Sequence, residues 1–235
     1  KYDLFTNIGK SYISQGFKYQ ESFEKQYMPI YTYKVEDIEI TKIICMEHFK
    51  NTVGVYYKVK NGKSNAKLTL APIMNFRNVH GMNHNHFYNL EQNINDKKIE
   101  VSIDVGNPIY MNISEGKYIQ HQNDIFGGMF YIEEEKRGFE PEENHSVPGR
   151  FEIEIEPFES KEFCIYLGED KEEIISKYNN IDNCYQELAT VKKYWFETLN
   201  KLQVKTPVES MNIMLNGWIL YQTIACRLWA RSGYY

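Results

Sequence analysis

The chain has 235 residues, of which 42% are hydrophobic and 15% aromatic, and its formal net charge at pH 7 is −5. This apolar content can bury a sizeable core, which argues against a disordered chain. The negative charge and the sequence pI near 5.8 argue against nucleic acid and anionic membrane surfaces as partners. No stretch reaches the roughly 18 consecutive apolar residues of a membrane-spanning helix, and no signal peptide opens the chain, so we expect a cytoplasmic protein.

Strand patterns dominate residues 16–167, where apolar side chains recur at every second position. Residues 53–59 alternate in this way before the turn pair Asn61-Gly62, which predicts a hairpin with the strand around residues 68–70. Residues 99–105 and 151–155 alternate as well, and the polar positions between them predict sheets with one face in solvent. Ten or more short strands without a helix among them predict a sandwich of antiparallel sheets.

Helical signals begin at residue 170. Asp170 and Glu173 have the spacing of a capping box, Asp182 is the predicted cap of a second helix, and Thr206-Pro207 starts a third. The third helix carries large apolar side chains on nearly every face, so it needs neighbours all round it. The predicted organisation is a β-sandwich domain over residues 1–169, a helical linker over 170–205 and one long helix over 206–235.

The four cysteines, at positions 45, 164, 184 and 226, are widely scattered and show no C-x-x-C spacing. They are therefore predicted to be reduced, buried thiols rather than a disulfide framework or a zinc site. In the run NFRNVHGMNHNHF, His80, His84 and His86 lie in a predicted loop without a metal signature, so no metal is expected. Arg77 and His80 are candidates for binding a sugar hydroxyl or an anion, and the alternative is a structural polar loop.

The run YIEEEKRGFEPEENH, residues 131–145, is rich in carboxylates, which are the groups that glycosidases use in pairs. Its glutamates stand among Lys, Arg, Pro and Asn, so we expect a solvated surface loop without a catalytic role. The preceding pair Gly127-Gly128 interrupts a strand pattern and predicts a β-bulge. No nucleotide, hydrolase or metalloprotease motif is present, and no cofactor is expected.

Residues 20–168 resemble the amino-terminal domain of glycogen debranching enzymes of the amylo-α-1,6-glucosidase type. The matching residues are Asn51-Thr52-Val53 after Met46, Pro72, NFRNVHGM at 75–82, Tyr131, Glu134, Arg137-Gly138, and Pro148-Gly149 before Phe151. Asn78 stands where that family often has an acid.

Residues 206–235 resemble the first helix of the (α/α)6 barrel in glycoside hydrolase family 94, the cellobiose phosphorylase and cyclic glucan synthase relatives. The matching residues are Thr206-Pro207, Leu215-Asn216, Trp218, Leu220-Tyr221-Gln222, Cys226-Arg227, Trp229-Ala230-Arg231-Ser232 and Tyr235.

Both resemblances imply a large β-sandwich (supersandwich), linker helices and an (α/α)6 barrel that holds the catalytic carboxylates. They imply that the chain is the amino-terminal, non-catalytic part of a glycoside phosphorylase or glycosidase acting on a glucose-containing oligosaccharide or glucan. Inorganic phosphate is the co-substrate in the phosphorolytic case, and sugar contacts are expected at Arg77, His80, Arg231 and Tyr235. The alternative is a stand-alone carbohydrate-binding or scaffold sandwich. Family 94 members are often dimers, and the oligomeric state, including a homodimer, stays open.

Overall fold

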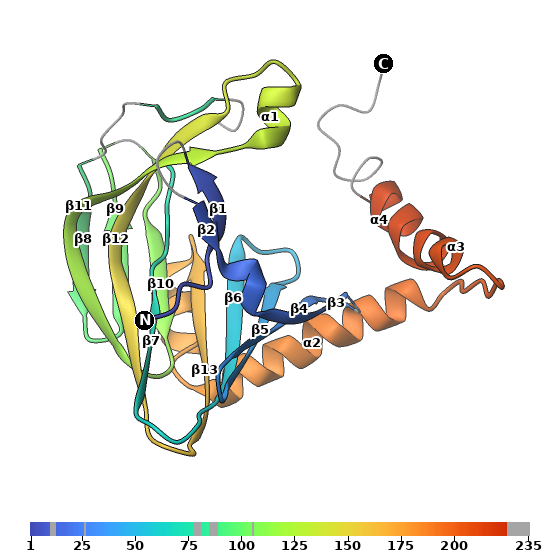
Figure 1. The fold of residues 1–235 in the computed structure, drawn as a ribbon, viewed down its shortest axis with the longest axis horizontal. Helices are drawn as coiled ribbons and strands as arrows, with labels where there is room; N and C mark the ends of the chain where they lie inside the picture. Colours follow the sequence, from blue (N-terminus) through green and yellow to red (C-terminus); the bar gives the residue numbers. More distant parts are fainter. Residues whose placement is uncertain (10–12, 26, 78–80, 85–88, 105, 225–235) are drawn as a thin grey trace. The chain divides into compact units, whose positions relative to one another are not determined.

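The computed structural model describes residues 1–9, 13–25, 27–77, 81–84, 89–104 and 106–224. The chain divides into two compact units, Lys1–Glu187 and Leu188–Tyr235. The first unit holds two antiparallel sheets (Figure 1). The predicted antiparallel sandwich is therefore confirmed.

The smaller sheet has five strands in the order β2-β1-β11-β12-β7. Their bounds are β1 Thr6–Gly9, β2 Ile13–Gln15, β7 Ala66–Leu70, β11 Lys117–Phe130 and β12 Glu142–Ile155. The predicted bulge at Gly127-Gly128 is confirmed, because the register between β11 and β12 shifts between Phe126 and Met129. Gly128 has a φ of 69° there, a conformation that glycine adopts at little cost.

The larger sheet has eight strands in the order β3-β4-β5-β6-β13-β10-β9-β8. Their bounds are β3 Gln20–Lys25, β4 Pro29–Val35, β5 Ile38–Met46, β6 Thr52–Lys60, β8 Glu91–Asn95, β9 Lys98–Ser102, β10 Ile109–Ile113 and β13 Ser160–Gly168. Between the sheets lies the main core, which includes the fully buried Ile99, Val101, Met111, Phe151 and Phe163. The alternating residues predicted for β9 and β12 thus face this core.

The predicted hairpin at Asn61-Gly62 is wrong. Strand β6 pairs with β5 and β13, whereas β7 pairs with β12 in the other sheet. The side-chain amide of Asn61 instead donates to the backbone carbonyls of Ser64, Ile155 and Glu156 at 2.8, 3.1 and 2.7 Å. These bonds fix a crossover that carries the chain from one sheet to the other.

Helical segments follow β13: the π-helical η2 Glu173–Lys177 and the long α2 Ile181–Leu199. The backbone N–H of Glu173 donates to Asp170 Oδ1 at 3.0 Å, so the predicted cap at Asp170 is confirmed. The second cap is Asn180 rather than Asp182, because Asn180 Oδ1 accepts from the backbone N–H of Asn183 at 2.9 Å. The first unit also holds two short helices, the 3-10 helix η1 Gly16–Tyr19 and α1 Ile132–Lys136.

The outer face of the eight-stranded sheet is covered at its centre, which corrects the expectation of a solvated face. Tyr56 and Tyr166 point outward from β6 and β13 and are buried. Tyr166 stacks on Tyr178 with ring centroids 3.6 Å apart, and the Tyr56 hydroxyl donates to the Cys184 carbonyl at 2.6 Å. Cys164 and Cys184 form a disulfide, so the prediction of reduced thiols is wrong for these two; it is confirmed for the buried Cys45, and Cys226 lies outside the described residues.

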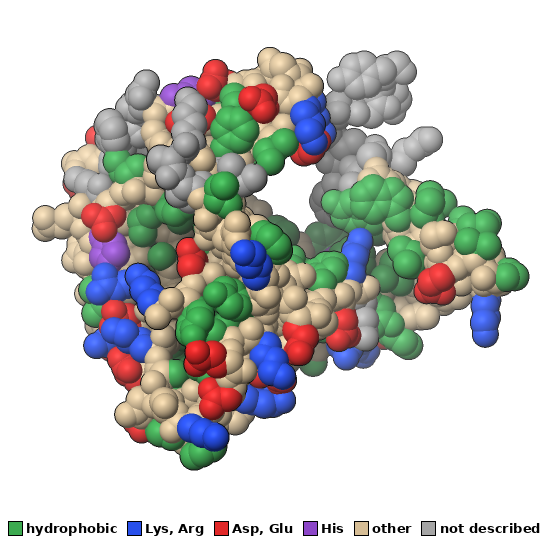
Figure 2. Space-filling model, in the orientation of Figure 1, with side chains coloured by type: hydrophobic (Ala, Val, Ile, Leu, Met, Phe, Trp, Pro, Cys, Tyr) green, Lys and Arg blue, Asp and Glu red, His purple; other side chains and the backbone are tan. Residues whose placement is uncertain are grey.

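The second unit contains a helical run made of α3 Glu209–Ile213, η3 Met214–Trp218 and α4 Ile219–Thr223. The helix begins at Glu209 after Val208, so the predicted cap at Thr206 is two residues early, although the Thr206 hydroxyl accepts from the backbone N–H of Val208 at 3.2 Å. Apolar side chains of this run remain exposed, among them Met211, Ile213, Met214, Trp218 and Tyr221 (Figure 2). No described helix is long and apolar enough to cross a membrane.

Candidate functional site

The predicted site residue Arg77 lies in a buried ion pair with Glu143. Strand β12 carries Glu143, whose side chain is fully buried, while the Arg77 side chain is 28% exposed. The guanidinium binds both carboxylate oxygens, through Nε to Oε1 and through Nη2 to Oε2 at 3.3 Å. Such a fork fixes both the position and the orientation of the arginine.

Two further donors hold the Glu143 carboxylate. The backbone N–H of Asn83 donates to Oε1 and the Tyr131 hydroxyl donates to Oε2, both at 3.1 Å. Burial alone would raise the pKa of Glu143, but Arg77, Asn83 and Tyr131 together hold that pKa below its ordinary value. The residue is therefore ionised at neutral pH, and it is an exception to the expectation that most of the carboxylates in residues 131–145 are solvated.

His145 lies two residues along β12 and extends this cluster on the same strand face. Its Nε2 is 3.1 Å from the Tyr131 hydroxyl, and its Nδ1 is 3.5 Å from the Asn75 amide nitrogen. Because the Tyr131 proton goes to Glu143, His145 donates through Nε2 and accepts weakly at Nδ1. Burial lowers the pKa of His145, Glu143 opposes that shift, and the net pKa lies below 6.5. We call Asn75, Arg77, Tyr131, Glu143 and His145 the Arg77 centre.

The backbone around β12 positions the Arg77 centre. Residues Met74 and Ser146 form an isolated antiparallel bridge with N···O distances of 2.8 and 2.9 Å, which brings the segment before Arg77 onto β12. Asn144, which points the other way from Glu143, accepts the Gly128 N–H at 2.8 Å and thereby ties in the β11 bulge. The Arg77 centre thus joins the segment that follows β7, which carries Arg77, to the segment between β11 and β12, which carries Tyr131.

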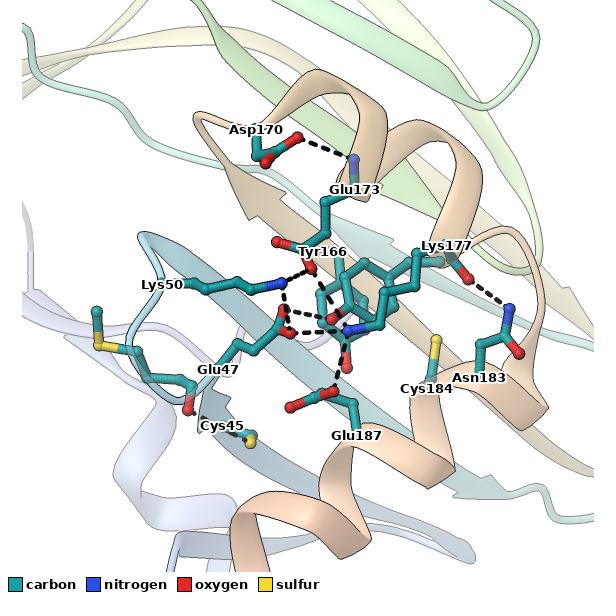
Figure 3. A network of polar contacts seen from close by, with 12 residues as sticks. Cys45, Glu47, Lys50, Tyr166, Asp170, Glu173, Lys177, Asn183, Cys184 and Glu187 are labelled. Carbon is teal, nitrogen blue, oxygen red and sulfur yellow. Dashed lines mark hydrogen bonds and ion pairs between the residues drawn. The ribbon is translucent and has the colours of Figure 1, made fainter.

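A second polar cluster lies on the outer face of the eight-stranded sheet (Figure 3). Lys177 of η2 contacts Glu47 at 2.7 Å, Glu187 at 3.1 Å and Glu173 at 3.4 Å. Lys50 binds Glu47 at 3.2 Å and also binds Glu173. We call Glu47, Lys50, Glu173, Lys177 and Glu187 the Lys177 network.

The Lys177 network anchors the helical linker to the sheet. Burial would lower the pKa of Lys177, but Glu47 and Glu187 raise it to about 12. Burial would likewise raise the pKa of Glu47, but Lys177, Tyr178 and Lys50 lower it. Glu47 and Lys177 are therefore charged at neutral pH, and the ion pairs of the network hold η2 and the start of α2 against the turn between β5 and β6.

The other predicted site residues belong to segments that the structure does not describe. His80, Arg231 and Tyr235 lie outside the described residues, as does His86, and His84 is exposed. Glu133 and Glu134 make exposed ion pairs with Lys136 at 2.6 Å and Arg137 at 3.3 Å. Within the described residues, no group of three or more His, Cys, Asp or Glu side chains is arranged to hold a metal ion.

Sequence reasoning missed the partners of Arg77. The positions of Glu143, His145 and Val147 have the two-residue period of a strand, which predicts that all three side chains lie on one face. This face of β12 is buried, and the pattern could have indicated that Glu143 is buried too. Tyr131 was noticed only through the family resemblance. The pairing with Arg77 spans 66 positions, and no local pattern encodes such a contact.

The described fold is an antiparallel β-sandwich with a helical extension, and its two polar clusters hold chain segments in place. Residues 1–162 match the family model described as glycogen debranching enzyme N terminal. The chain belongs to that family. Residues 194–235 match a second model, the catalytic domain of the glycosyl hydrolase 94 superfamily.

Curated relatives match short parts of the chain. N,N'-diacetylchitobiose phosphorylase of Vibrio furnissii is 31% identical over 91 residues, which cover 37% of this chain and 11% of the relative. Cyclic beta-(1,2)-glucan synthase of Rhizobium meliloti (strain 1021) is 27% identical over 88 residues, which cover 36% of this chain and 3% of the relative. The chain thus spans about a tenth or less of the length of these relatives.

Solved structures with a similar arrangement include a bacterial glucoamylase complexed with acarbose, with a TM-score of 0.44 and 17% identity over 83% of this chain and 31% of that one. A heparan sulfate lyase from Pedobacter heparinus has a TM-score of 0.42 and 10% identity over 65% of this chain and 22% of the lyase.

Proposed function

We propose that this chain is the N-terminal, non-catalytic part of a cytoplasmic enzyme that cleaves or transfers glucosyl units of an oligosaccharide or glucan. The observation that carries the proposal is the order of two family matches along one chain. Residues 1–162 match the debranching-enzyme N-terminal model, and residues 194–235 match the catalytic domain of the glycosyl hydrolase 94 superfamily. The relatives named as phosphorylases and as a glucan synthase support a carbohydrate substrate.

The electrostatics of the described carboxyl groups support a non-catalytic role. Glycosidic cleavage requires a carboxylic acid whose pKa is raised, so that it can protonate the leaving oxygen. The described glutamates with a clear shift all have a lowered pKa, namely Glu39, Glu47, Glu143, Glu152, Glu159 and Glu162. In the Arg77 centre the Glu143 carboxylate is ion-paired with Arg77. We infer that Glu143 positions the segment that carries Arg77 and does not supply a proton.

Phosphorolysis and hydrolysis are the two open reactions, and they differ in the nucleophile. Inorganic phosphate would attack in the first case and water in the second. Arg231 and Tyr235 remain predicted sugar contacts, and His80 remains one beside Arg77. A homodimer remains a prediction from the family 94 resemblance.

The test compares the 235-residue chain with the complete natural protein on glucooligosaccharides and glucans, with and without inorganic phosphate. We expect the natural protein to release glucose or a glucose 1-phosphate, and the 235-residue chain to release neither. Turnover by the chain would contradict its non-catalytic role. Binding without turnover by the natural protein would instead support the alternative of a carbohydrate-binding or scaffold module.

A further inference from the structure

A row of aromatic side chains crosses the inner face of the eight-stranded sheet near its β3 edge. In the strand register Phe23 of β3 faces Tyr31 of β4, Tyr31 faces Lys42 of β5, and Lys42 faces Tyr57 of β6. Tyr33 lies two residues beyond Tyr31 and therefore on the same face. We call these five residues the inner-face row.

The inner-face row runs from the core toward solvent. Tyr33 and Tyr57 pack against the main core, Tyr31 and Lys42 are half-buried, and Phe23 is 49% exposed. Ring centroids lie 4.9 Å apart for Phe23 and Tyr31, and 6.3 Å apart for the nearly parallel rings of Tyr31 and Tyr33. The ammonium of Lys42 lies 5.9 Å from the Tyr31 ring centroid. The row is therefore a preformed aromatic surface with one cation on it.

The polar ends of the row have no partner in the described part of the chain. The hydroxyls of Tyr31, Tyr33 and Tyr57 accept and donate no hydrogen bond there, and no described carboxylate lies within ion-pair distance of Lys42. Tyr31, Tyr33 and Lys42 are half-buried, whereas the Tyr57 hydroxyl lies deeper, and burial raises its pKa. The hydroxyls of Tyr31 and Tyr33 and the ammonium of Lys42 can therefore bond a group from outside the sheet.

On the opposite face of the same sheet, the tyrosine hydroxyls are hydrogen-bonded to other residues of the protein. The hydroxyl of Tyr56 donates to the Cys184 carbonyl at 2.6 Å, and Tyr178 and Tyr185 donate to Glu47 and Glu162. Neighbouring lysines are also paired, as Lys58 with Glu162 at 2.5 Å and Lys60 with Glu39 at 2.6 Å. The polar groups of the inner-face row are not bonded by any described residue, so a ligand can bond them in place of water.

We propose that the inner-face row is a carbohydrate-binding site for a chain of pyranose sugars, separate from the predicted contacts at Arg77 and His80. A pyranose presents an apolar C–H face, which packs on aromatic rings, and hydroxyls at its edge, which take hydrogen bonds from phenols and an ammonium. The choice of a sugar rests on the proposed function. The edge strand β3 carries Glu21, Glu24 and Lys25, charges that disfavour pairing with a strand of another protein.

The test measures binding of maltoheptaose, cellohexaose and chitohexaose to the protein by isothermal titration calorimetry. The variants are Tyr31→Phe, which removes one hydroxyl, Tyr31→Ala, which removes the ring, and Lys42→Met, which removes the cation and keeps the alkyl chain. The matched control is Lys171→Met, because Lys171 also lies over a tyrosine ring, at 5.5 Å from Tyr110, but is paired with Glu100 at 3.0 Å. Melting curves verify that each variant is folded.

We expect one of the three sugars to bind, Tyr31→Ala to weaken that binding about tenfold, and Tyr31→Phe and Lys42→Met to weaken it about threefold. Lys171→Met should bind as the unmodified protein does. Unchanged affinity in the folded Tyr31→Phe and Lys42→Met variants, or no binding of any of the three sugars, would overturn the proposal.

Two further outcomes separate this proposal from the proposed function. If the natural protein turns over glucans while the row variants bind them normally, the proposed function stands and the site is wrong. If the natural protein shows no turnover but the row variants lose sugar binding, the site stands and the enzyme assignment fails. A dimer in sedimentation velocity that dissociates in Lys42→Met would assign the face to a second copy of the chain and overturn the sugar site.

Discussion

The Arg77 centre and the Lys177 network are both buried charge clusters, and they balance their charges in different ways. In the Arg77 centre one carboxylate meets one guanidinium, and the neutral His145 and Tyr131 complete the hydrogen bonds. The Lys177 network places the three carboxylates of Glu47, Glu173 and Glu187 around two lysines. The first is a neutral pair with polar support, and the second carries an excess negative charge.

This difference shows which element each cluster can hold. A neutral, directional fork suits a connection such as residues 71–77, whose backbone must meet β12 at one place. A lysine ammonium is less directional than a guanidinium, so Lys177 can contact three carboxylates at once. Such contacts suit a helix that lies across a sheet. We therefore expect the two clusters to respond differently when one member is removed.

Removing Glu47 should have the largest effect. Glu47→Ala takes away the acceptor of Lys177, Lys50 and the Tyr178 hydroxyl, and Tyr178 is buried. The side chains of Lys177 and Lys50 are 38% and 44% exposed and keep their contacts with the other glutamates of the network. We therefore expect a loss of about 2 to 3 kcal/mol in free energy of unfolding, below the range for a charge left buried without a partner. Urea unfolding measures this loss. Glu47→Gln is the control, since it keeps an acceptor oxygen and should lose less. A loss below about 1 kcal/mol for Glu47→Ala would show that the network does not anchor the helix.

Removing Arg77 should have an intermediate effect. Arg77→Met leaves the Glu143 carboxylate buried, but Asn83 and Tyr131 still donate to it. We expect a loss of about 2 kcal/mol in urea unfolding, below the range for a carboxylate left without donors. Lys34→Met, which breaks an exposed contact of 3.9 Å with Glu21, is the control and should cost less than about 0.5 kcal/mol. A loss for Arg77→Met as small as this control would contradict a structural role for the fork.

The sequence predicted the strands because burial on one face imposes a period of two, and this holds for β9 and β12 alike. It did not predict the strand partners, since the period states which side chains share a face and says nothing about the neighbouring strand. The turn at Asn61-Gly62 shows this, because the bonds from Asn61 to Ile155 and Glu156 come from residues more than 90 positions away.

The candidate site was predicted only in part for the same reason. Arg77 was predicted to bind a sugar hydroxyl or an anion, which stays a prediction, and its partner Glu143 stands in a segment whose composition is typical of solvated surface. Its burial depends on Arg77 and Asn83, 66 and 60 positions away. The Cys164–Cys184 disulfide joins β13 to α2 across 20 positions without a local motif, so the spacing of the cysteines gave no sign of it.

The smallest expected effect concerns pH and tests the neutral state of His145 in the Arg77 centre. His145 has a folded-state pKa below its unfolded value of 6.5. Above pH 6.5 both states are neutral, and as the pH falls below 6.5 the unfolded state takes up the proton first. The free energy of unfolding therefore falls with falling pH, by less than about 1.4 kcal/mol per pH unit, the limit for one proton. His145→Gln should flatten this decline between pH 6.5 and 5, whereas the exposed His84→Gln should leave it unchanged. Equal slopes for His145→Gln and the unmodified protein would mean that the pKa of His145 is the same in the folded and unfolded states, which would contradict its burial as a neutral group.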